Sequence, residues 1–347
     1  MSLTSPRTIS IPVPGATLLE VEHLTVTFPT SAGPVDVVQD ASFRVEAGDT
    51  LGIVGESGSG KSMTSLAIMG LLPRGGTATG SIRLNGHELL GRTDREMRRV
   101  RGDKVAMVFQ DPLSSLNPYY TVGLQIEEAY RAHRGGTRRN ARRVVIEALE
   151  RVRIADAARR VDHYPHQFSG GMRQRIMIAM ALCLQPDLLI ADEPTTALDV
   201  TIQAQILELI AELQQRLQLA VLLITHDLGV VAGVCHRVAV MYGGKIVETG
   251  PAGELFRRPG HPYTAGLLRS TPRLDLVQHR LSGIEGVPPE LLDPPPGCPY
   301  EPRCPLAVER CASEMPPLAD YDGREVACWR AFATSDGEPA GARSLPG

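Results

Sequence analysis

Short apolar runs alternate with stretches of helical periodicity along most of the chain, a pattern typical of an α/β protein. Residues 50–54, 188–191 and 220–225 are almost entirely apolar, which predicts strands of a parallel sheet buried on both faces. Between residues 202 and 217 the apolar positions recur every three or four residues, which predicts a helix packed through one apolar stripe. The stripe comprises Ile202, Ile206, Leu209, Ile210, Leu213 and Leu217.

Weaker patterns predict further elements. Residues 18–28 alternate in places between apolar and polar, which indicates an edge strand; other strands are expected at 37–45, 80–85 and 104–109. Residues 238–242 and 245–247 are split by a Gly-Gly pair, which predicts a hairpin. The pattern from 123 to 185 is helical, and we interpret its basic cluster as a solvated helix face. That cluster comprises Arg131, Arg134, Arg138, Arg139, Arg142 and Arg143.

Composition narrows the class of protein. The chain has 347 residues, 43% of them apolar, which suits two domains or one large domain with an appendage. The net charge of −3 gives no general basic bias, so nucleic acid is not an expected partner. The chain lacks both a bilayer-spanning apolar run and a signal-peptide pattern, which predicts a cytosolic protein. Its six cysteines are then not expected to form disulfides, and Cys183 and Cys235 have apolar neighbours typical of core positions.

A phosphate-binding loop follows the first apolar strand. It fits the pattern G-x-x-x-x-G-K-[ST] and comprises Gly55, Glu56, Ser57, Gly58, Ser59, Gly60, Lys61 and Ser62. Residues 63–72 are predicted to form the helix that such a loop needs, whose positive N-terminus attracts an anion. Lys61 would reach the outer phosphates, and the Ser62 hydroxyl would ligate Mg²⁺.

Polar residues end two of the other apolar strands. Asp192 and Glu193 follow one strand, where the first acid can hold Mg²⁺ and the second can orient and deprotonate water. His226 follows another, and its position there makes a functional role as plausible as a structural one. A helix start at Ser169 and Gly170 offers a second anion site, although such a sequence is more often an ordinary helix cap.

With these motifs in hand, residues 18–330 resemble an ATP-binding cassette (ABC) ATPase of the transporter type. The resemblance makes the phosphate loop the Walker A motif, 188–192 the Walker B motif, and 197–199 the D-loop. It implies that Glu193 is catalytic, that His226 is the switch histidine, and that Gln110 ligates Mg²⁺ and senses the membrane subunit. The nucleotide-binding positions that it adds are Phe28 for the adenine ring, Met63, Ser169, Gly170, Gly171, Met172 and Asp199.

Two residues depart from the family pattern around the signature motif. Phe168 stands where Leu is usual, and Met172 stands where Gln is usual, so one polar contact to nucleotide is lost. The serine and glycines of the motif are intact, and we expect a competent signature. The family places two cassettes head to tail, with each ATP held between one Walker A motif and the opposite signature. ATP binding would then stabilise the closed pair, and hydrolysis would remove the bridge.

The resemblance also implies a domain organisation. We expect a flexible N-terminus at 1–17 and a nucleotide-binding domain at 18–252, with a P-loop ATPase core, an antiparallel β subdomain and a helical signature subdomain at about 111–185. A small Cys-rich extension would occupy 253–330, and 331–347 would be a disordered tail.

His261, Pro262 and Tyr263, with the cysteines after them, resemble the ATPase subunits of dipeptide and oligopeptide importers. Such a subunit would lie at the cytoplasmic face of the membrane, with a second, sibling ATPase subunit, two permease subunits and an extracytoplasmic peptide-binding protein. Relatives carry nickel, glutathione or oligosaccharides, so these remain alternative cargoes.

Four cysteines within a short, Pro-rich segment suggest a single metal or cluster site; they are Cys298, Cys304, Cys311 and Cys328. Thiolate ligands suit either zinc or iron–sulfur, and a site without metal is a third possibility. The spacing lacks the C-x₂-C pairs common for structural zinc. The resemblance to peptide importers favours a [4Fe–4S] cluster, whose role would be to staple a domain with little core.

Two other functions fit parts of the sequence. One is a soluble cassette protein acting on ribosomes or DNA, but such proteins carry two cassettes or a long coiled coil, and residues 62–169 show no sustained heptads. The other is a regulatory module that binds ATP without hydrolysing it, which Met172 would allow but Glu193 and His226 argue against.

Overall fold

The computed structural model describes residues 15–110, 115–195, 198–270, 283–292 and 294–333. In these residues the main sheet has eight strands in the order β11-β12-β10-β9-β3-β8-β7-β6. Its parallel centre consists of β6 (Val105–Val108), β7 (Leu188–Asp192), β8 (Ala220–Thr225), β3 (Thr50–Val54) and β9 (Arg237–Tyr242). The antiparallel strands β10 (Lys245–Pro251), β12 (Arg324–Val326) and β11 (Ala319–Tyr321) extend it. The predicted central strands and the predicted hairpin are therefore confirmed.

The central strands are buried on both faces because each face has its own apolar cluster. Along β7, Leu188 and Ile190 belong to one cluster, whereas Leu189 and Ala191 belong to the other. This two-sided burial explains why the strand has no polar alternation. The helix α8 (Val200–Leu217) buries the predicted stripe, except that Ile202 is only half-buried and Leu217 is exposed at the helix end.

A second, antiparallel sheet has the order β2-β1-β4-β5. Its strands are β1 (Thr17–Thr30), β2 (Gly33–Glu46), β4 (Thr77–Leu84) and β5 (His87–Glu88). The prediction of an edge strand at 18–28 was wrong, since β1 pairs with both β2 and β4. Partial alternation shows that one face of a strand is buried, but it carries no information on how many strands pair with its edges.

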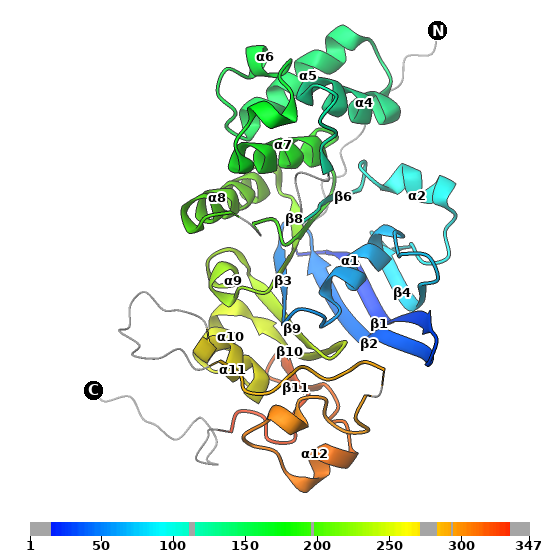
Figure 1. Ribbon diagram of the computed structural model, residues 1–347, viewed down its shortest axis with the longest axis vertical. Helices are drawn as coiled ribbons and strands as arrows, with labels where there is room; N and C mark the ends of the chain where they lie inside the picture. Colours follow the sequence, from blue (N-terminus) through cyan, green and yellow to red (C-terminus); the bar gives the residue numbers. More distant parts are fainter. Residues whose placement is uncertain (1–14, 111–114, 196–197, 271–282, 293, 334–347) are drawn as a thin grey trace, which may run out of the picture.

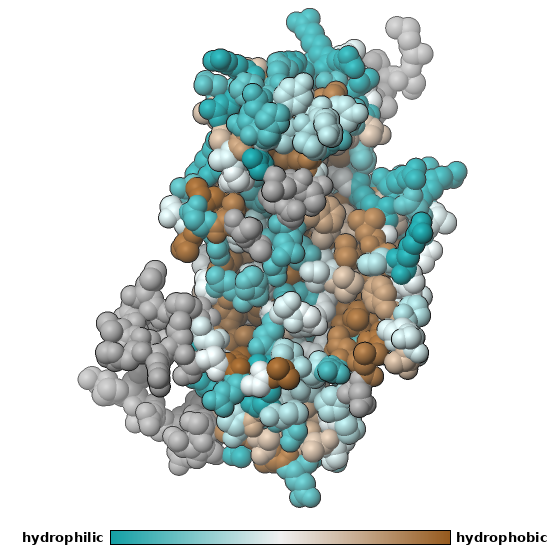
Figure 2. All heavy atoms as spheres, in the orientation of Figure 1, coloured by the Kyte–Doolittle hydropathy of each residue, from teal (hydrophilic) through white to brown (hydrophobic). Residues whose placement is uncertain are grey.

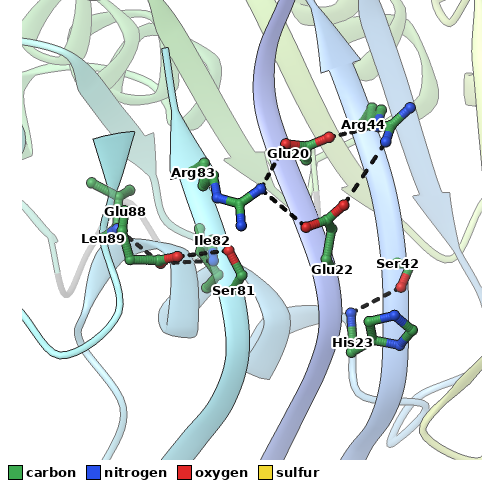
Figure 3. A network of polar contacts seen from close by, with 10 residues as sticks. All are labelled: Glu20, Glu22, His23, Ser42, Arg44, Ser81, Ile82, Arg83, Glu88 and Leu89. Atoms are coloured by element: carbon green, nitrogen blue, oxygen red, sulfur yellow. Dashed lines mark hydrogen bonds and ion pairs between the residues drawn. The ribbon is translucent and has the colours of Figure 1, made fainter. Parts of the chain in front are cut away.

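Charged side chains cover one face of this second sheet (Figure 3). Arg83 on β4 donates to Glu22 at 3.1 Å and also contacts Glu20, and both glutamates lie on β1. Arg44 on β2 forms an ion pair with Glu20 at 2.9 Å from the other side. These exposed cross-strand pairs align three strands and keep this face in water, while the opposite face packs into the core.

The helix α1 (Lys61–Met69) packs between the two sheets, in contact with β1, β2 and β7. Three further helices lie on the cassette: α2 (Asp94–Val100), α9 (Leu228–Val234) and α10 (Ala252–Arg257). The sequence patterns did not predict these three helices, because each has only six or seven residues and spans too few turns to establish a helical period.

A helical region forms one end of the long axis (Figure 1). It contains α4 (Val122–Arg134), α5 (Arg138–Arg151), α6 (Ala157–Arg160), the 3₁₀ turn Pro165–Gln167 and α7 (Gly170–Leu182). Thr121, Thr137 and Ser169 cap α4, α5 and α7 through their hydroxyl groups. All six arginines of the predicted solvated face are exposed, and Figure 2 shows hydrophilic residues gathered over this end.

The C-terminal extension lies at the opposite end (Figure 1). It begins with α11 (Pro262–Ser270) and continues through the 3₁₀ turn Glu301–Arg303, α12 (Glu309–Ser313) and the strands β11 and β12. Because β12 pairs with β10, the extension is a continuation of the main sheet and not a separately tethered module. Within the described part of the chain, no helix is both long and apolar enough to cross a bilayer.

Candidate active site

The phosphate loop connects the end of β3 to the start of α1, as predicted. Its glycines are needed because the backbone passes very close to neighbouring strands. A Cβ atom on Gly55 would lie 2.1 Å from the Met241 carbonyl oxygen, and one on Gly60 would lie 2.6 Å from that of Val37. Gly60 also has a φ angle of 104°, a backbone conformation that residues other than glycine rarely adopt. The loop is thus a fixed cradle held between β2 and β9.

Lys61 is the cation of this cradle. Its ammonium group donates to the carbonyl oxygens of Gly55 and Glu56, each at 2.8 Å, so the side chain curls back over the loop. Burial lowers the pKa of Lys61, whereas the carboxylates of Glu193, Asp192 and Glu56 oppose that shift. An arriving phosphate would offer the ammonium group better acceptors than these carbonyls.

Hard oxygen ligands suited to Mg²⁺ lie beside Lys61. The Ser62 hydroxyl donates to Asp192 at 3.1 Å, and Ser65 donates to the other carboxylate oxygen at 3.3 Å. Burial raises the pKa of Asp192, while hydrogen bonds from the two serines counteract the shift. A carboxylate paired with a hydroxyl at the mouth of a phosphate loop suits the chemistry of a magnesium–phosphate complex.

Glu193 lies next to this pair and contacts the two other predicted catalytic side chains. The Gln110 amide donates to Glu193 at 2.9 Å, and the His226 Nδ1 atom lies 3.2 Å from the second carboxylate oxygen. Gln110, Glu193 and His226 follow β6, β7 and β8 respectively, so the carboxyl ends of adjacent parallel strands bring them together. Glu193 has a φ angle of 45°, an unusual conformation that directs its side chain into the site.

These groups surround an open cavity of about 870 Å³. The predicted site residues that line it are Glu56, Ser57, Gly58, Gly60, Lys61, Ser62, Met63, Gln110, Glu193 and His226. Gly55, Ser59 and Asp192 lie in or against the same loop but do not line the cavity. Among the described residues, the buried Ser59 hydroxyl of the loop has no hydrogen-bond partner.

The extension contributes four further lining residues that the sequence patterns did not indicate: Leu267, Ser270, Ile284 and Leu291. No local motif marks them, because they reach the cavity only through the fold of the extension. The apolar side chains of Leu267, Ile284 and Leu291 are suited to contact a base or ribose more than a phosphate.

The predicted signature residues do not line this cavity and make local contacts at the starts of two helices. The Ser169 hydroxyl accepts a hydrogen bond from the Met172 amide at 3.4 Å, and a Cβ atom on Gly171 would meet Ile202 at 2.6 Å. Asp199 caps α8 by accepting from the Ile202 amide at 3.0 Å. None of the signature residues, nor Asp199, is among the described residues that line the cavity.

Phe28 and Met172 also have specific local contacts. Phe28 is half-buried at the end of β1, where its ring lies against Gly76, and it does not line the cavity. Its role in adenine stacking therefore stays a prediction. The Met172 sulfur lies 3.7 Å from an Arg160 nitrogen, so the side chain that replaces the usual glutamine has a partner within the helical region.

The four cysteines of the extension line one small cavity of about 10 Å³, together with His261 and Tyr300. Burial raises the pKa of Cys298 to about 11 and that of Cys328 to about 12. All six cysteines are free thiols, and Cys183 and Cys235 are buried in the core as predicted. In the described residues, no group of three or more His, Cys, Asp or Glu side chains is arranged to hold a metal ion.

Comparison with known proteins agrees with this geometry. Residues 38–196 match the ABC transporter family, and residues 247–311 match the C-terminal region of oligopeptide/dipeptide transporters. The chain is 50% identical over 330 residues to the oligopeptide transport ATP-binding protein OppD of Salmonella typhimurium, covering 95% of this chain and 98% of OppD. It is 52% identical over 315 residues to the dipeptide transport ATP-binding protein DppD of Bacillus subtilis, covering 90% and 94%.

Solved structures give the same result for the fold. The dimeric structure of MJ0796, a bacterial ABC transporter cassette, superposes with a TM-score of 0.61 at 27% identity, covering 68% of this chain and 99% of that one. A dimeric post-hydrolysis state of the same cassette, bound to ADP and Pi, also gives a TM-score of 0.61, at 26% identity and with coverage of 68% and 99%. The chain belongs to the ATP-binding cassette transporter family, within its group of oligopeptide and dipeptide transport ATP-binding proteins.

Proposed function

We propose that this chain is the ATP-hydrolysing motor subunit of an importer for dipeptides or oligopeptides. The observation that carries the proposal is the convergence of Lys61, the Ser62–Asp192 pair and the Gln110–Glu193–His226 group on one open cavity. The relatives at about 50% identity support peptides as the cargo, ahead of nickel, glutathione or oligosaccharides.

Each group has a distinct part in hydrolysis. The loop amides and Lys61 hold the β- and γ-phosphates and stabilise the charge that develops during phosphoryl transfer. Ser62, Asp192 and Gln110 would hold Mg²⁺, which would neutralise part of the phosphate charge. Glu193 accepts a proton from the attacking water, and His226 keeps the carboxylate oriented.

A second cassette completes the site. The signature start at Ser169 does not line the cavity of its own chain, so we propose that the first amides of α7 contact an ATP bound by a partner. Two cassettes placed head to tail would bury two ATP molecules, and ATP would stabilise the closed pair by mass action. Dimeric relatives support this arrangement, and we propose that the partner is a sibling ATPase subunit.

A separate groove suits the membrane partner. It has a volume of about 360 Å³ and is lined mainly by apolar residues, including Met107, Phe109, Met177 and Met180; Phe109 immediately precedes Gln110 in the sequence. Tyr119 and Tyr120 are 84% and 48% exposed nearby in the sequence. Methionine-rich surfaces accommodate apolar protein segments, so we propose that a permease docks here, at the cytoplasmic face of the membrane.

Co-expression with the candidate permeases tests this function. A tagged version of this chain should co-purify with two permease subunits and a sibling ATPase. In proteoliposomes its ATP turnover should rise when a peptide-loaded binding protein is added, and a binding protein without peptide is the matched control. Turnover that never responds to peptide would reject the importer, while association with ribosomes or DNA would favour the soluble class. ATP binding without turnover would favour the regulatory module.

We also propose that the four cysteines of the extension hold a [4Fe–4S] cluster. The donor set suits it, since four free thiols line one cavity. The cavity has room for about one water molecule, so the thiols would have to move outward around a cluster. A bound cluster would supply cross-linking, which a domain with little core needs.

Iron and acid-labile sulfide analysis of anaerobically purified protein checks this prediction. We expect equal amounts of iron and sulfide, about four of each per chain, as the composition of a [4Fe–4S] cluster requires. Replacing Cys311 by Ser should lower both together and should lower the melting temperature. Replacing Cys183, which is buried in the core, serves as the control and should leave iron and sulfide unchanged. Zinc without iron, or no metal at all, would reject the cluster.

A further inference from the structure

The Cys-rich extension contacts the phosphate loop through the guanidinium group of Arg303. Arg303, which immediately precedes Cys304, forms a two-pronged ion pair with Glu56, the second residue of the loop. Its two terminal nitrogens lie 2.7 and 3.0 Å from the two carboxylate oxygens. The Arg303 side chain is only 5% exposed, and that of Glu56 is 26% exposed. Paired hydrogen bonds of this kind fix both charge and orientation.

The remaining donors of Arg303 are also engaged. The Arg303 Nε atom donates to the Glu285 carbonyl oxygen at 3.0 Å, and the terminal nitrogens also donate to the Ile284 carbonyl oxygen and the Tyr242 hydroxyl. All five N–H groups of the side chain therefore have acceptors. Because Ile284 lines the nucleotide cavity, the same guanidinium group joins the phosphate loop, the end of β9 and one wall of the cavity.

The charged groups around the cavity indicate what the Arg303–Glu56 ion pair does. Glu56 and Glu193 line the cavity, Asp192 lies behind Ser62, and Lys61 is the cation of the loop itself. The Glu56 carboxylate acts on the Lys61 ammonium group, so its field reaches the position where phosphates would bind. Without Arg303, that carboxylate would repel the phosphates of an ATP molecule bound in the cavity.

We propose that Arg303 is a positioning residue for ATP: it neutralises Glu56 and orients it away from the phosphates, so that the extension sets the affinity of the loop for nucleotide. The inference rests on the proposed ATPase function. A loop amide also contributes to the arrangement, since the Glu56 N–H donates to the Tyr263 hydroxyl of the extension at 2.9 Å. Tyr263 packs on Tyr242 with ring centroids 4.4 Å apart, and the Arg303 guanidinium group lies over the Tyr242 ring. The tyrosine pair therefore helps to hold the guanidinium group in place.

Equilibrium binding of a non-hydrolysable ATP analogue with Mg²⁺ to the full-length chain tests the proposal. Arg303→Gln should raise the Kd about tenfold, which corresponds to about 1.4 kcal/mol. Arg303→Lys keeps the positive charge and should raise the Kd by a smaller factor. Adding Glu56→Gln to Arg303→Gln should restore most of the affinity, because the unpaired carboxylate is then gone. Glu56→Gln alone should bind at least as tightly as the wild type.

The matched control is Arg310→Gln, which changes an arginine that also precedes a cysteine of the extension but pairs with the exposed Glu314. Its Kd should equal that of the wild type. A purely structural role for Arg303 predicts that the double variant binds as weakly as Arg303→Gln, and that Glu56→Gln also weakens binding; either result would overturn the proposal. If Arg303→Gln does not fold, Glu56→Gln and the double variant still decide. A wild-type chain that binds no nucleotide would instead refute the proposed function.

Discussion

Replacing Glu193 by Gln is expected to slow ATP hydrolysis by about 10²–10⁴-fold, the usual contribution of a general base. Glutamine keeps the shape of the side chain: its single amide oxygen can still accept from Gln110, and its NH₂ group can donate to a neutral His226. It cannot take a proton from water at neutral pH. ATP binding should therefore persist, and the variant should accumulate as an ATP-bound pair of cassettes. Turnover by phosphate release and association by size-exclusion chromatography measure the two effects.

The control for this variant is Glu208→Gln on the exposed face of α8, which makes the same change at a residue that does not line the cavity. Its turnover should match that of the wild type. If Glu193→Gln hydrolyses ATP at the wild-type rate, Glu193 is not the base. If the variant neither binds ATP nor associates, the carboxylate has a structural role that its contacts with Gln110 and His226 do not account for.

Replacing Glu248 by Ala is expected to destabilise the protein by about 3–5 kcal/mol, the cost of leaving a buried charge unpaired. Glu248 on β10 has a fully buried side chain and lies 2.6 Å from Arg324 of β12, whose side chain is 7% exposed. The carboxylate also accepts from the backbone amides of Gly260 and His261 at 2.7 and 2.9 Å. Alanine has no acceptor atom, so Arg324 and the two backbone amides would all lose this hydrogen-bond partner. The free energy of unfolding from urea titration measures the effect, and hydrogen exchange should show β12 opening first.

Glu314→Ala is the matched control, because Glu314 pairs with Arg310 in the same extension but both side chains are more than half exposed. It should cost less than about 1 kcal/mol. A double variant, Glu248→Met with Arg324→Leu, should recover part of the lost stability by replacing the ion pair with apolar contacts. A cost for Glu248→Ala as small as that of the control would mean that β12 does not depend on this pair.

The sequence predicted the catalytic side of the site in detail. The phosphate loop is a continuous motif whose chemistry depends on neighbours along the chain, and Lys61 and Ser62 lie where it requires. Asp192, Glu193 and His226 were also found, because each follows an apolar run and the carboxyl ends of parallel strands meet at one edge, whereas Gln110 was found through the family resemblance. The strands themselves were predictable since burial on both faces leaves an unmistakable apolar pattern.

The position of the extension could not be predicted in this way. Nothing near Arg303 in the sequence points to Glu56, 247 residues earlier, and nothing near Arg324 points to Glu248. A single arginine in a Pro-rich segment has no periodicity, and its partner is determined by how β12 joins the sheet. The same holds for Ile284 and Leu291, which reach the nucleotide cavity from a segment without a motif.

The sequence by itself determined the fold class, the phosphate-loop motif and the candidate site residues, because local motifs and strand burial encode those properties within short stretches of chain. The tertiary structure alone decided that β1 is an inner strand and that the signature residues do not line the cavity at the phosphate loop of the same chain. It also decided that the Cys-rich extension forms an ion pair with the phosphate loop. The physical reason is that these are pairings between distant segments. Their energies come from edge hydrogen bonds and buried charges, which leave no trace in the order of neighbouring residues.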